Sequence, residues 1–506
     1  MFMASTAALS SAGPDRVWSM DWKFSRASFT QRSSPSRTLA IQFNAFFDFL
    51  PVRFDTTSLD GQHRPYPSHL RNILRLAIPA MLALASVPSL NIGDTAMIGR
   101  LGVEPLAARA VGAALIGGIY WIFAFLTFGT TTLVGHYHGS RDFEACGATY
   151  VHALVLALLG GLGVSLAGLF LAPNLYRLMG AAPGVIDAGI PYFRVIITSA
   201  PFTFVFFASV GFFRGVQDTK TPMLIAFLAN GLNLVLDYVL IYGGFGILPM
   251  GLKGAAIAAW IAQFLGATIC LSVFVCSARN GRYRPSKWRV NIVQFRPLFR
   301  IGRDLAIRTG ALRFSLIVAT GTAARMGAEI LSAHEIAFQL LLLCSDIIDG
   351  LAVAGQALVA KYLGSNQKDM AYRMGKTLIL CGGVAGCLFA GMFLSAEAWI
   401  VQIFTSSSDV KRIFSGEIFL LVALFQPLNG IVFVLDGFLI GAHDTQFLMW
   451  AMLVGALGIF VPLSWLSLQW GWGLPGVWVG VSALMTWRLL TNFGRFVGKG
   501  WSAAVP

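Results

Sequence analysis

Charged residues are scarce in this chain of 506 residues. Only 12% are Asp, Glu, Lys or Arg, whereas 56% are hydrophobic and the mean hydropathy is +0.70. Soluble domains carry about 25% charged residues. The shortage extends from Asn72 to Val497, so it excludes a water-soluble protein and indicates one that crosses a membrane several times.

Motifs of catalysis and of ATP hydrolysis are also missing. The chain has no GxxxxGK[ST] phosphate loop, which argues against an ATP-driven pump, and no HExxH zinc motif. None of the six cysteines forms a CxxC pair, so we interpret them as small core residues. His136 and His138 flank Tyr137 without a cluster of further ligands. We therefore expect neither an enzyme nor a metal site.

Apolar segments of about 20 residues, long enough to cross a bilayer as helices, recur along the chain. They predict an all-α polytopic membrane protein with twelve transmembrane helices joined by short loops. The predicted spans are 73–97, 110–136, 147–172, 188–212, 221–243, 252–277, 305–326, 334–360, 371–395, 412–440, 446–468 and 474–496.

The net charge of +14 gathers mainly between the sixth and seventh predicted spans, at residues 279–304. Eight basic residues lie there: Arg279, Arg282, Arg284, Lys287, Arg289, Arg296, Arg300 and Arg303. The positive-inside rule places this loop in the cytoplasm, and an even number of spans places both chain ends there too. The distribution favours a membrane protein and no nucleic-acid partner.

The first 68 residues differ from the rest because they are rich in Ser and Arg. They also contain several acidic residues, which transit peptides generally lack. Residues 1–68 are a targeting sequence, a disordered tail or an over-extended start, and the sequence does not choose among these.

Four sequence motifs recur in the same order at a spacing of 225 or 226 residues. The pairs are Arg100–Ala108 with Arg325–Ala333, Leu133–Ser140 with Leu358–Ser365, Pro201 with Pro427, and Gly215–Thr219 with Gly441–Thr445. The repeat predicts an N-lobe at 69–278 (helices 1–6) and a C-lobe at 305–501 (helices 7–12). Two parallel repeats of this kind are typical of secondary transporters.

An acid in the middle of a span suggests a function, because it costs about 2.5–3.5 kcal/mol on insertion scales. Asp237 lies in an apolar segment, with Asn233 four residues earlier on the same helix face. Such a pair can load and release a proton. The alternative is a structural pair that faces a neighbouring helix.

Other charged or polar residues fall inside predicted spans as well. Asp94 lies at the far end of the first span, 15 residues after Pro79, which permits a kink; Pro88 could supply the bend equally well. Tyr192 lies in the fourth span and is either a donor to one of the acids or an interfacial tyrosine. Arg308 and Asp349 are expected to form a mainly structural pair between the seventh and eighth spans.

These residues resemble the multidrug and toxic compound extrusion (MATE) family over roughly residues 70–501. The resemblance is carried by Asp94–Gly102 with Leu106–Ala108, by Phe213–Pro222 and by Asn233–Asp237. Within the family the chain is most similar to the DinF-like branch, on Ile307–Thr309, Asp349–Gly350 and Gly494–Trp501.

The resemblance implies two six-helix lobes and export of small organic or toxic compounds, driven by inward flow of H⁺ or Na⁺. It implies a coupling site at Asp94, Tyr192, Asn233 and Asp237, with Pro79 as the gating proline. The seventh span has no carboxylate after Asp304, so the C-lobe sodium site of other branches is not expected.

From these observations we expect a proton-coupled antiporter that uses the N-lobe carboxylates. A sodium-coupled exporter and a flippase for lipid-linked precursors are the alternatives. We expect a monomer in a lipid bilayer, with a small-molecule substrate and no cofactor beyond the coupling ion. The plasma (inner) membrane is the first expectation for its location, and a plastid membrane is the second.

Overall fold

The structure, a computed structural model, describes residues 66–503 except 245, 280, 282, 286–291 and 406. The extension at 1–68 therefore lies almost wholly outside the described residues, as do Arg282, Lys287 and Arg289 of the basic loop. The described part is nearly all helical, as the spacing of apolar segments predicted.

The first half of the described chain forms six spans, and we call it the N-lobe. Spans two and four each consist of two consecutive helices. The helices are α2 (Tyr66–Gly99), α3 (Val103–Ile122), α4 (Phe125–Gly139), α5 (Phe143–Leu178), α6 (Pro183–Ile197), α7 (Ala200–Gly215), α8 (Lys220–Tyr242) and α9 (Gly251–Arg279).

The second half, which we call the C-lobe, repeats this order with more interruptions. A π-helix, η2 (Val454–Phe460), lies inside the eleventh span, and a short 3₁₀ turn, η3 (Gly500–Ala503), follows the last one. The other helices are α10 (Ile292–Met326), α11 (Ala328–Gly364), α12 (Lys368–Phe404), α13 (Ser408–Phe414), α14 (Glu417–Leu424), α15 (Gln426–Gly441), α16 (Thr445–Leu453), α17 (Val461–Gln469) and α18 (Gly473–Val497).

Most of these spans are apolar enough to cross a membrane. Among the described residues nine segments pass by length and composition, and the bent pair of α6 and α7 makes a tenth. The remaining two, α10 and α18, are 35 and 25 residues long but carry buried charges such as Asp304 and Arg488. Those charges have partners inside the C-lobe, which explains how two less apolar helices complete the twelve spans.

The internal repeat is visible in the backbone as well as in the sequence. Residues with positive φ recur at the spacing of the repeat: Arg141 (63°) with Asn366 (58°), Gln217 (67°) with His443 (63°), and Gly102 (124°) with Gly327 (126°). Each pair ends or begins equivalent helices in the two lobes. The two halves therefore share local backbone geometry at their turns.

Two matching prolines break the fourth and tenth spans at equivalent places. Pro201 is the second residue of α7, and Pro427 is the second residue of α15. A proline has no N–H to donate and tolerates only the first turn of a helix, so a new helix begins there. The first break bends α6 relative to α7 by 47°.

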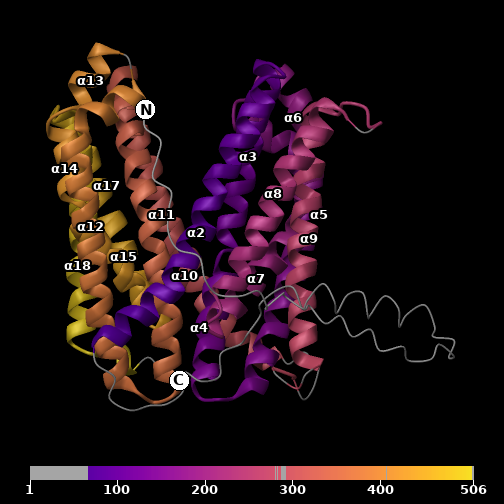
Figure 1. Cartoon of the computed structure of the whole chain (residues 1–506). Helices are drawn as coiled ribbons and strands as arrows, with labels where there is room; N and C mark the ends of the chain where they lie inside the picture. The colour runs from indigo at the N-terminus through magenta and orange to yellow at the C-terminus, as the bar shows by residue number, and fades with distance from the viewer. Residues whose placement is uncertain are drawn as a thin grey trace, which may run out of the picture. The chain divides into compact units, whose positions relative to one another are not determined.

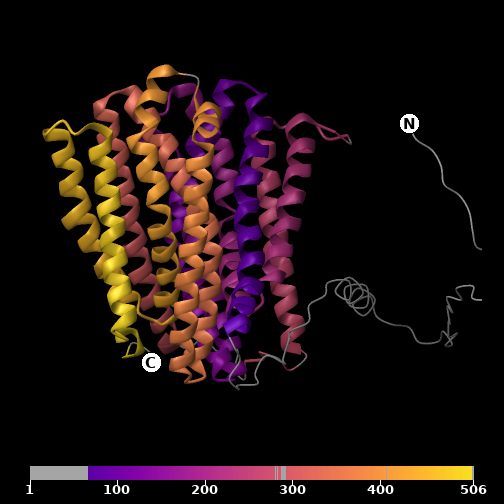
Figure 2. The same ribbon diagram turned by 60° about the vertical axis from the view of Figure 1, so that its left-hand side comes forward.

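The two lobes pack against one another through a few helices. Figures 1 and 2 show α3–α9 gathered on one side and α12–α18 on the other, with α2 running between the groups. α2 packs against α8 of its own lobe and against α11 of the other lobe, and α11 also packs against α4. The main contacts between the lobes are therefore those of α11 with α2 and α4, and α10 adds a smaller contact with α4.

α4 and α11 pack side by side, with one glycine at the C-terminal end of each helix in close contact with the other helix, and we call this contact the α4–α11 crossing. A Cβ placed on Gly139 would lie 2.0 Å from the carbonyl oxygen of Lys361, and one on Gly364 would lie 1.8 Å from that of His136. Any side chain at either glycine would overlap the opposite backbone. Both contacts are related by the repeat, since Gly139 and His136 correspond to Gly364 and Lys361.

Candidate functional site

Asp237 and Asn233 lie on the buried face of α8. Their exposed fractions are 1% and 3%, whereas Val235 and Tyr238 on the other side of the helix are 61% and 64% exposed. Four residues correspond to about one helical turn, so the carboxyl and the amide stack along one face. This face is turned towards α2 and α9, the helices that α8 packs against.

α2 and α8 run side by side in register, which brings Asp94 to the level of Asp237. At one end Asn230 Nδ2 donates to Ser86 Oγ at 2.9 Å, and at the other Tyr242 Oη donates to the carbonyl of Met97 at 2.7 Å. Between them the side chain of Leu234 lies directly against Gly93. A Cβ at position 93 would lie 2.5 Å from the Leu234 Cδ2 atom, so a bulkier residue there would require the Leu234 side chain to move.

The carboxylate of Asp237 is buried without a donor. Both of its oxygens lack a hydrogen-bond partner, as does Oδ1 of Asp94. Asp94 nevertheless lies within side-chain hydrogen-bonding reach of Asp237. Two ionised carboxylates can only accept hydrogen bonds, so a bond between them requires that one holds a proton. The geometry thus suits a shared proton.

A cation not among the predicted site residues completes this group. Arg109, on α3, donates from Nη1 to Thr95 Oγ1 at 2.9 Å and from Nη2 to Asp94 Oδ2 at 3.4 Å. It also lies 3.4 Å from the carbonyl oxygen of Asn91. In sequence it is a single arginine among alanines and valine, a signal that could have marked it as a residue with a buried partner.

Tyr192 of α6 also faces this group. It is 6% exposed, and Asp94, Asp237 and Arg109 are all close enough to act electrostatically on its hydroxyl. Gly112 of α3 makes room for the ring, because a Cβ there would lie 2.8 Å from it. α2, α3, α6 and α8 therefore bring Asp94, Arg109, Tyr192 and Asp237 together, which we call the N-lobe charge cluster.

Pro79 is buried within α2, but it does not divide the helix. α2 is one continuous helix from Tyr66 to Gly99, with both Pro79 and Pro88 inside it. Each proline removes one backbone hydrogen bond and so weakens the helix locally. The gating role of Pro79 stays a prediction.

The prediction that Arg308 pairs with Asp349 is wrong, because Arg308 has a different acidic partner. Arg308 forms its ion pair with Asp436 on α15, and Arg488 on α18 binds the same carboxylate oxygen. Asn492 Nδ2 donates to the other oxygen of Asp436 at 2.8 Å. A helix span fixes which residues share a face, but not which neighbouring helix that face meets, so spacing could not identify Asp436.

Polar side chains join the lobes at the α4–α11 crossing. Gln217 Nε2 donates to the carbonyl of Ala357 at 2.9 Å, from the N-lobe to the C-lobe. At the equivalent position, the ring of His443 from the C-lobe lies 5.4 Å from that of His136 in the N-lobe. Neither ring nitrogen of His443 has a hydrogen-bond partner. Deeper in the same interface, Gln356 Nε2 donates to the carbonyl of Phe128 at 2.7 Å and to Thr132 Oγ1 at 2.8 Å.

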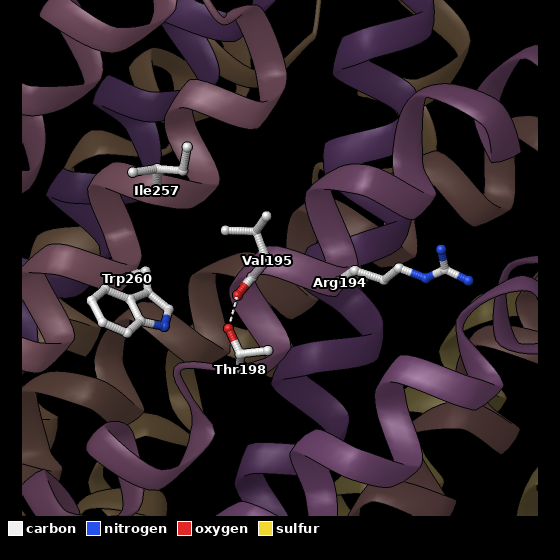
Figure 3. A pocket seen from close by; sticks show the side chains of 5 residues that line it. All are labelled: Arg194, Val195, Thr198, Ile257 and Trp260. Carbon is white, nitrogen blue, oxygen red and sulfur yellow. Dashed lines mark hydrogen bonds between the residues drawn. The ribbon is translucent and has the colours of Figure 1, made fainter.

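A cavity of about 300 Å³ lies apart from these residues, between α6 and α9. Figure 3 shows Trp260 and Ile257 on one wall and Val195 and Thr198 on another, with the guanidinium of Arg194 directed away from Trp260. Thr198 Oγ1 donates to the carbonyl of Val195 at 2.6 Å, so its hydroxyl is already used. The cavity contains none of the predicted site residues.

The comparison with known proteins agrees with this arrangement. The sequence profile of the MatE family matches residues 79–239 and 311–466, one segment in each lobe and together more than half of the chain. The chain belongs to the MatE family. A MatE protein is a membrane transporter and not an enzyme, and this chain is therefore a transporter of the efflux class.

Curated relatives in bacteria and plants match the MatE chain over most of its length. DNA damage-inducible protein F of Escherichia coli is 26% identical, over 82% of this chain and 89% of the relative. Protein DETOXIFICATION 44, chloroplastic, of Arabidopsis thaliana is 30% identical, over 86% of this chain and 84% of the relative. The match to the first of these agrees with the DinF-like resemblance of the sequence.

Solved MATE structures share the fold. A MOP superfamily transporter from Pyrococcus furiosus superimposes with a TM-score of 0.76 at 21% identity, over 88% of this chain and 99% of that chain. A MATE transporter in a bent conformation gives 0.78 at 21% identity, over 86% and 97%. At this identity the likeness shows the two-lobe fold alone.

Proposed function

We propose that this MatE transporter is an antiporter that exports small organic compounds in exchange for protons. The carboxylate of Asp237 is the observation that carries the proposal, since it is buried, has no donor and lies within reach of Asp94. A proton on either acid converts two repelling acceptors into a hydrogen-bonded pair. Loading and release of that proton would change how tightly α2 packs on α8.

The mechanism follows from where α2 lies. α2 packs against α8 beside the N-lobe charge cluster and against α11 of the opposite lobe. A change in the spacing of α2 and α8 therefore reaches the interface between the lobes. A monovalent ion that crosses 100 mV provides about 2.3 kcal/mol, before any pH difference is counted. This is enough to bias a two-state change of the lobes by about fiftyfold.

Orientation and location are part of the proposal. We place the ends of α4 and α11, and the basic segment 279–304, on the cytoplasmic side. The plasma (inner) membrane is our first location, and the name of the Arabidopsis thaliana relative supports a plastid membrane as the second. Small organic substrates are supported by relatives from Shewanella oneidensis and Thermotoga maritima named as probable multidrug resistance proteins.

The decisive experiment measures proton movement driven by substrate in liposomes that contain purified protein, with and without sodium. Asp237→Asn should abolish substrate-induced proton release. Asp346→Asn, the same change at an exposed C-lobe position, is the matched control and should keep it. Proton coupling that survives in Asp237→Asn, or wild-type transport that requires sodium alone, would overturn the proposal.

A further inference from the structure

Arg109 occupies the oxygens that a metal cation would need in the N-lobe charge cluster. Its guanidinium contacts three oxygens of α2, from the Asp94 carboxylate, the Thr95 hydroxyl and the Asn91 carbonyl. Its side chain is 11% exposed, and that of Asp94 is 18% exposed. An ion pair this enclosed is weakly screened by solvent, so the guanidinium acts on the whole cluster.

With both acids ionised, the N-lobe charge cluster carries one excess negative charge. Asp94 and Asp237 contribute two negative charges when both are ionised, and Arg109 contributes one positive charge. The other titratable groups that face them are the phenols of Tyr192 and, beyond it, Tyr120 and Tyr176. Phenols are neutral at physiological pH, because their ordinary pKa is about 10. One added positive charge therefore neutralises the cluster.

A proton and a metal ion differ in what they require at this place. A proton needs one carboxylate oxygen, and both oxygens of Asp237 lack a donor. A bare metal cation needs a shell of several oxygens at once to replace its water. To gather that shell from α2, the ion would have to displace Arg109 from Asp94 and Thr95 while being repelled by its charge.

We propose that Arg109 is a tethered counter-ion that makes the N-lobe charge cluster accept one proton per cycle and reject sodium. The inference rests on the proposed function, since it assumes that Asp237 is the coupling acid. Arg109 is a specificity-determining residue in this scheme. Its fixed positive charge permanently balances one of the two carboxylates. Only the other carboxylate therefore gains and loses a cation, the coupling proton, during transport.

The test replaces Arg109 with Gln and, as the conservative control, with Lys. Transport, sodium stimulation and the ratio of protons to substrate are measured in liposomes, and binding of ²²Na⁺ to the purified protein is measured separately. Wild type and Arg109→Lys should ignore sodium and move about one proton per substrate. Arg109→Gln should bind and respond to sodium, or raise the proton ratio from about one towards two, one per free carboxylate.

A second pair of variants covers the case in which Arg109→Gln does not fold. Asp94→Asn frees the Arg109 guanidinium to act on Asp237. The pH profile of proton-coupled transport should therefore shift to lower pH. The double variant Asp94→Asn with Arg109→Gln removes the pair as a neutral unit, so the pH profile should return towards that of wild type.

Two results would overturn the inference. One is wild-type protein that binds ²²Na⁺ in a manner abolished by Asp237→Asn; the other is a folded Arg109→Gln with wild-type sodium response and proton ratio. Failure of the proposed function looks different, because proton coupling would then survive Asp237→Asn whatever residue stands at 109.

Discussion

Acid should loosen the α4–α11 crossing through His443. The ring lies in the turn between α15 and α16, against His136 of the other lobe, and neither of its nitrogens has a partner. Burial, and then the neighbouring His136, lower the pKa of His443 to about 3. The ordinary pKa of histidine is about 6.5, which applies once the lobes separate and the ring meets water.

The size and the sign of the effect follow from that difference. The packed crossing holds His443 neutral. The stability of the packed form relative to the separated form is therefore complete above the ordinary pKa of about 6.5, and it is lost as the pH falls from there towards 3. Each pH unit in that window weakens the packed form by about 1.4 kcal/mol. Between neutral pH and about pH 5.5, the packed form should lose about tenfold in its equilibrium constant.

The separation of the lobes can be measured as a distance between spin labels. Glu144 and Asp369 are exposed, lie just beyond the crossing and correspond to one another in the repeat, so they suit labelling in a cysteine-free background. Acid should shift the distance distribution towards longer distances in wild type. His443→Gln should reduce the shift, because the equivalent residue Gln217 holds the same turn with a neutral amide, while His136 of the other lobe remains in the contact.

His334→Gln is the matched control, since His334 is a buried histidine of the C-lobe beside Thr320. This variant should keep the acid response of wild type. If His443→Gln retains the full acid shift, or if wild type shows none between neutral pH and about pH 5.5, the reasoning from burial is refuted.

Two further changes test the interface and the C-lobe. Gly364→Val should prevent the crossing from closing and so stop transport, since its Cβ would lie 1.8 Å from the His136 carbonyl oxygen; Gly391→Val, at a glycine with open space, should transport normally. Transport by Gly364→Val at the wild-type rate would contradict this. Asp436→Asn should lower stability by about 3–5 kcal/mol, seen as a lower Tm in detergent, because two buried guanidinium groups lose their anion. Asp409→Asn breaks only an exposed pair and should change little, and equal Tm losses in the two variants would count against the buried cluster.

The features that depend on one helix could be predicted from the sequence. The stacking of Asn233 and Asp237 needs only the pitch of α8, and the structure places both on its buried face. The repeat is visible in the sequence because matched motifs occupy matched turns, and the similar positive φ values of Gln217 and His443 confirm it. Twelve spans followed from apolar lengths in the same way.

Features that depend on which helices meet could not be predicted in this way. Arg308 binds Asp436, 128 residues away, because α15 rather than α11 presents the carboxylate that accepts from it. Arg109 joins Asp94 across two helices; its apolar sequence neighbours indicate that it needs a partner but do not identify which residue that is. Packing between helices decides these contacts, and a hydropathy pattern contains no record of it.

The glycine contacts at the α4–α11 crossing have the form of an isologous interface in a twofold dimer. Gly139 receives the backbone beside Gly364, and Gly364 receives the backbone beside Gly139, although both belong to one chain. Because the two halves belong to one chain, equivalent positions can hold different residues, as Gln217 and His443 do. At the crossing, each half remains the binding partner of the other. A side chain added at one glycine therefore requires a compensating change on the opposite helix.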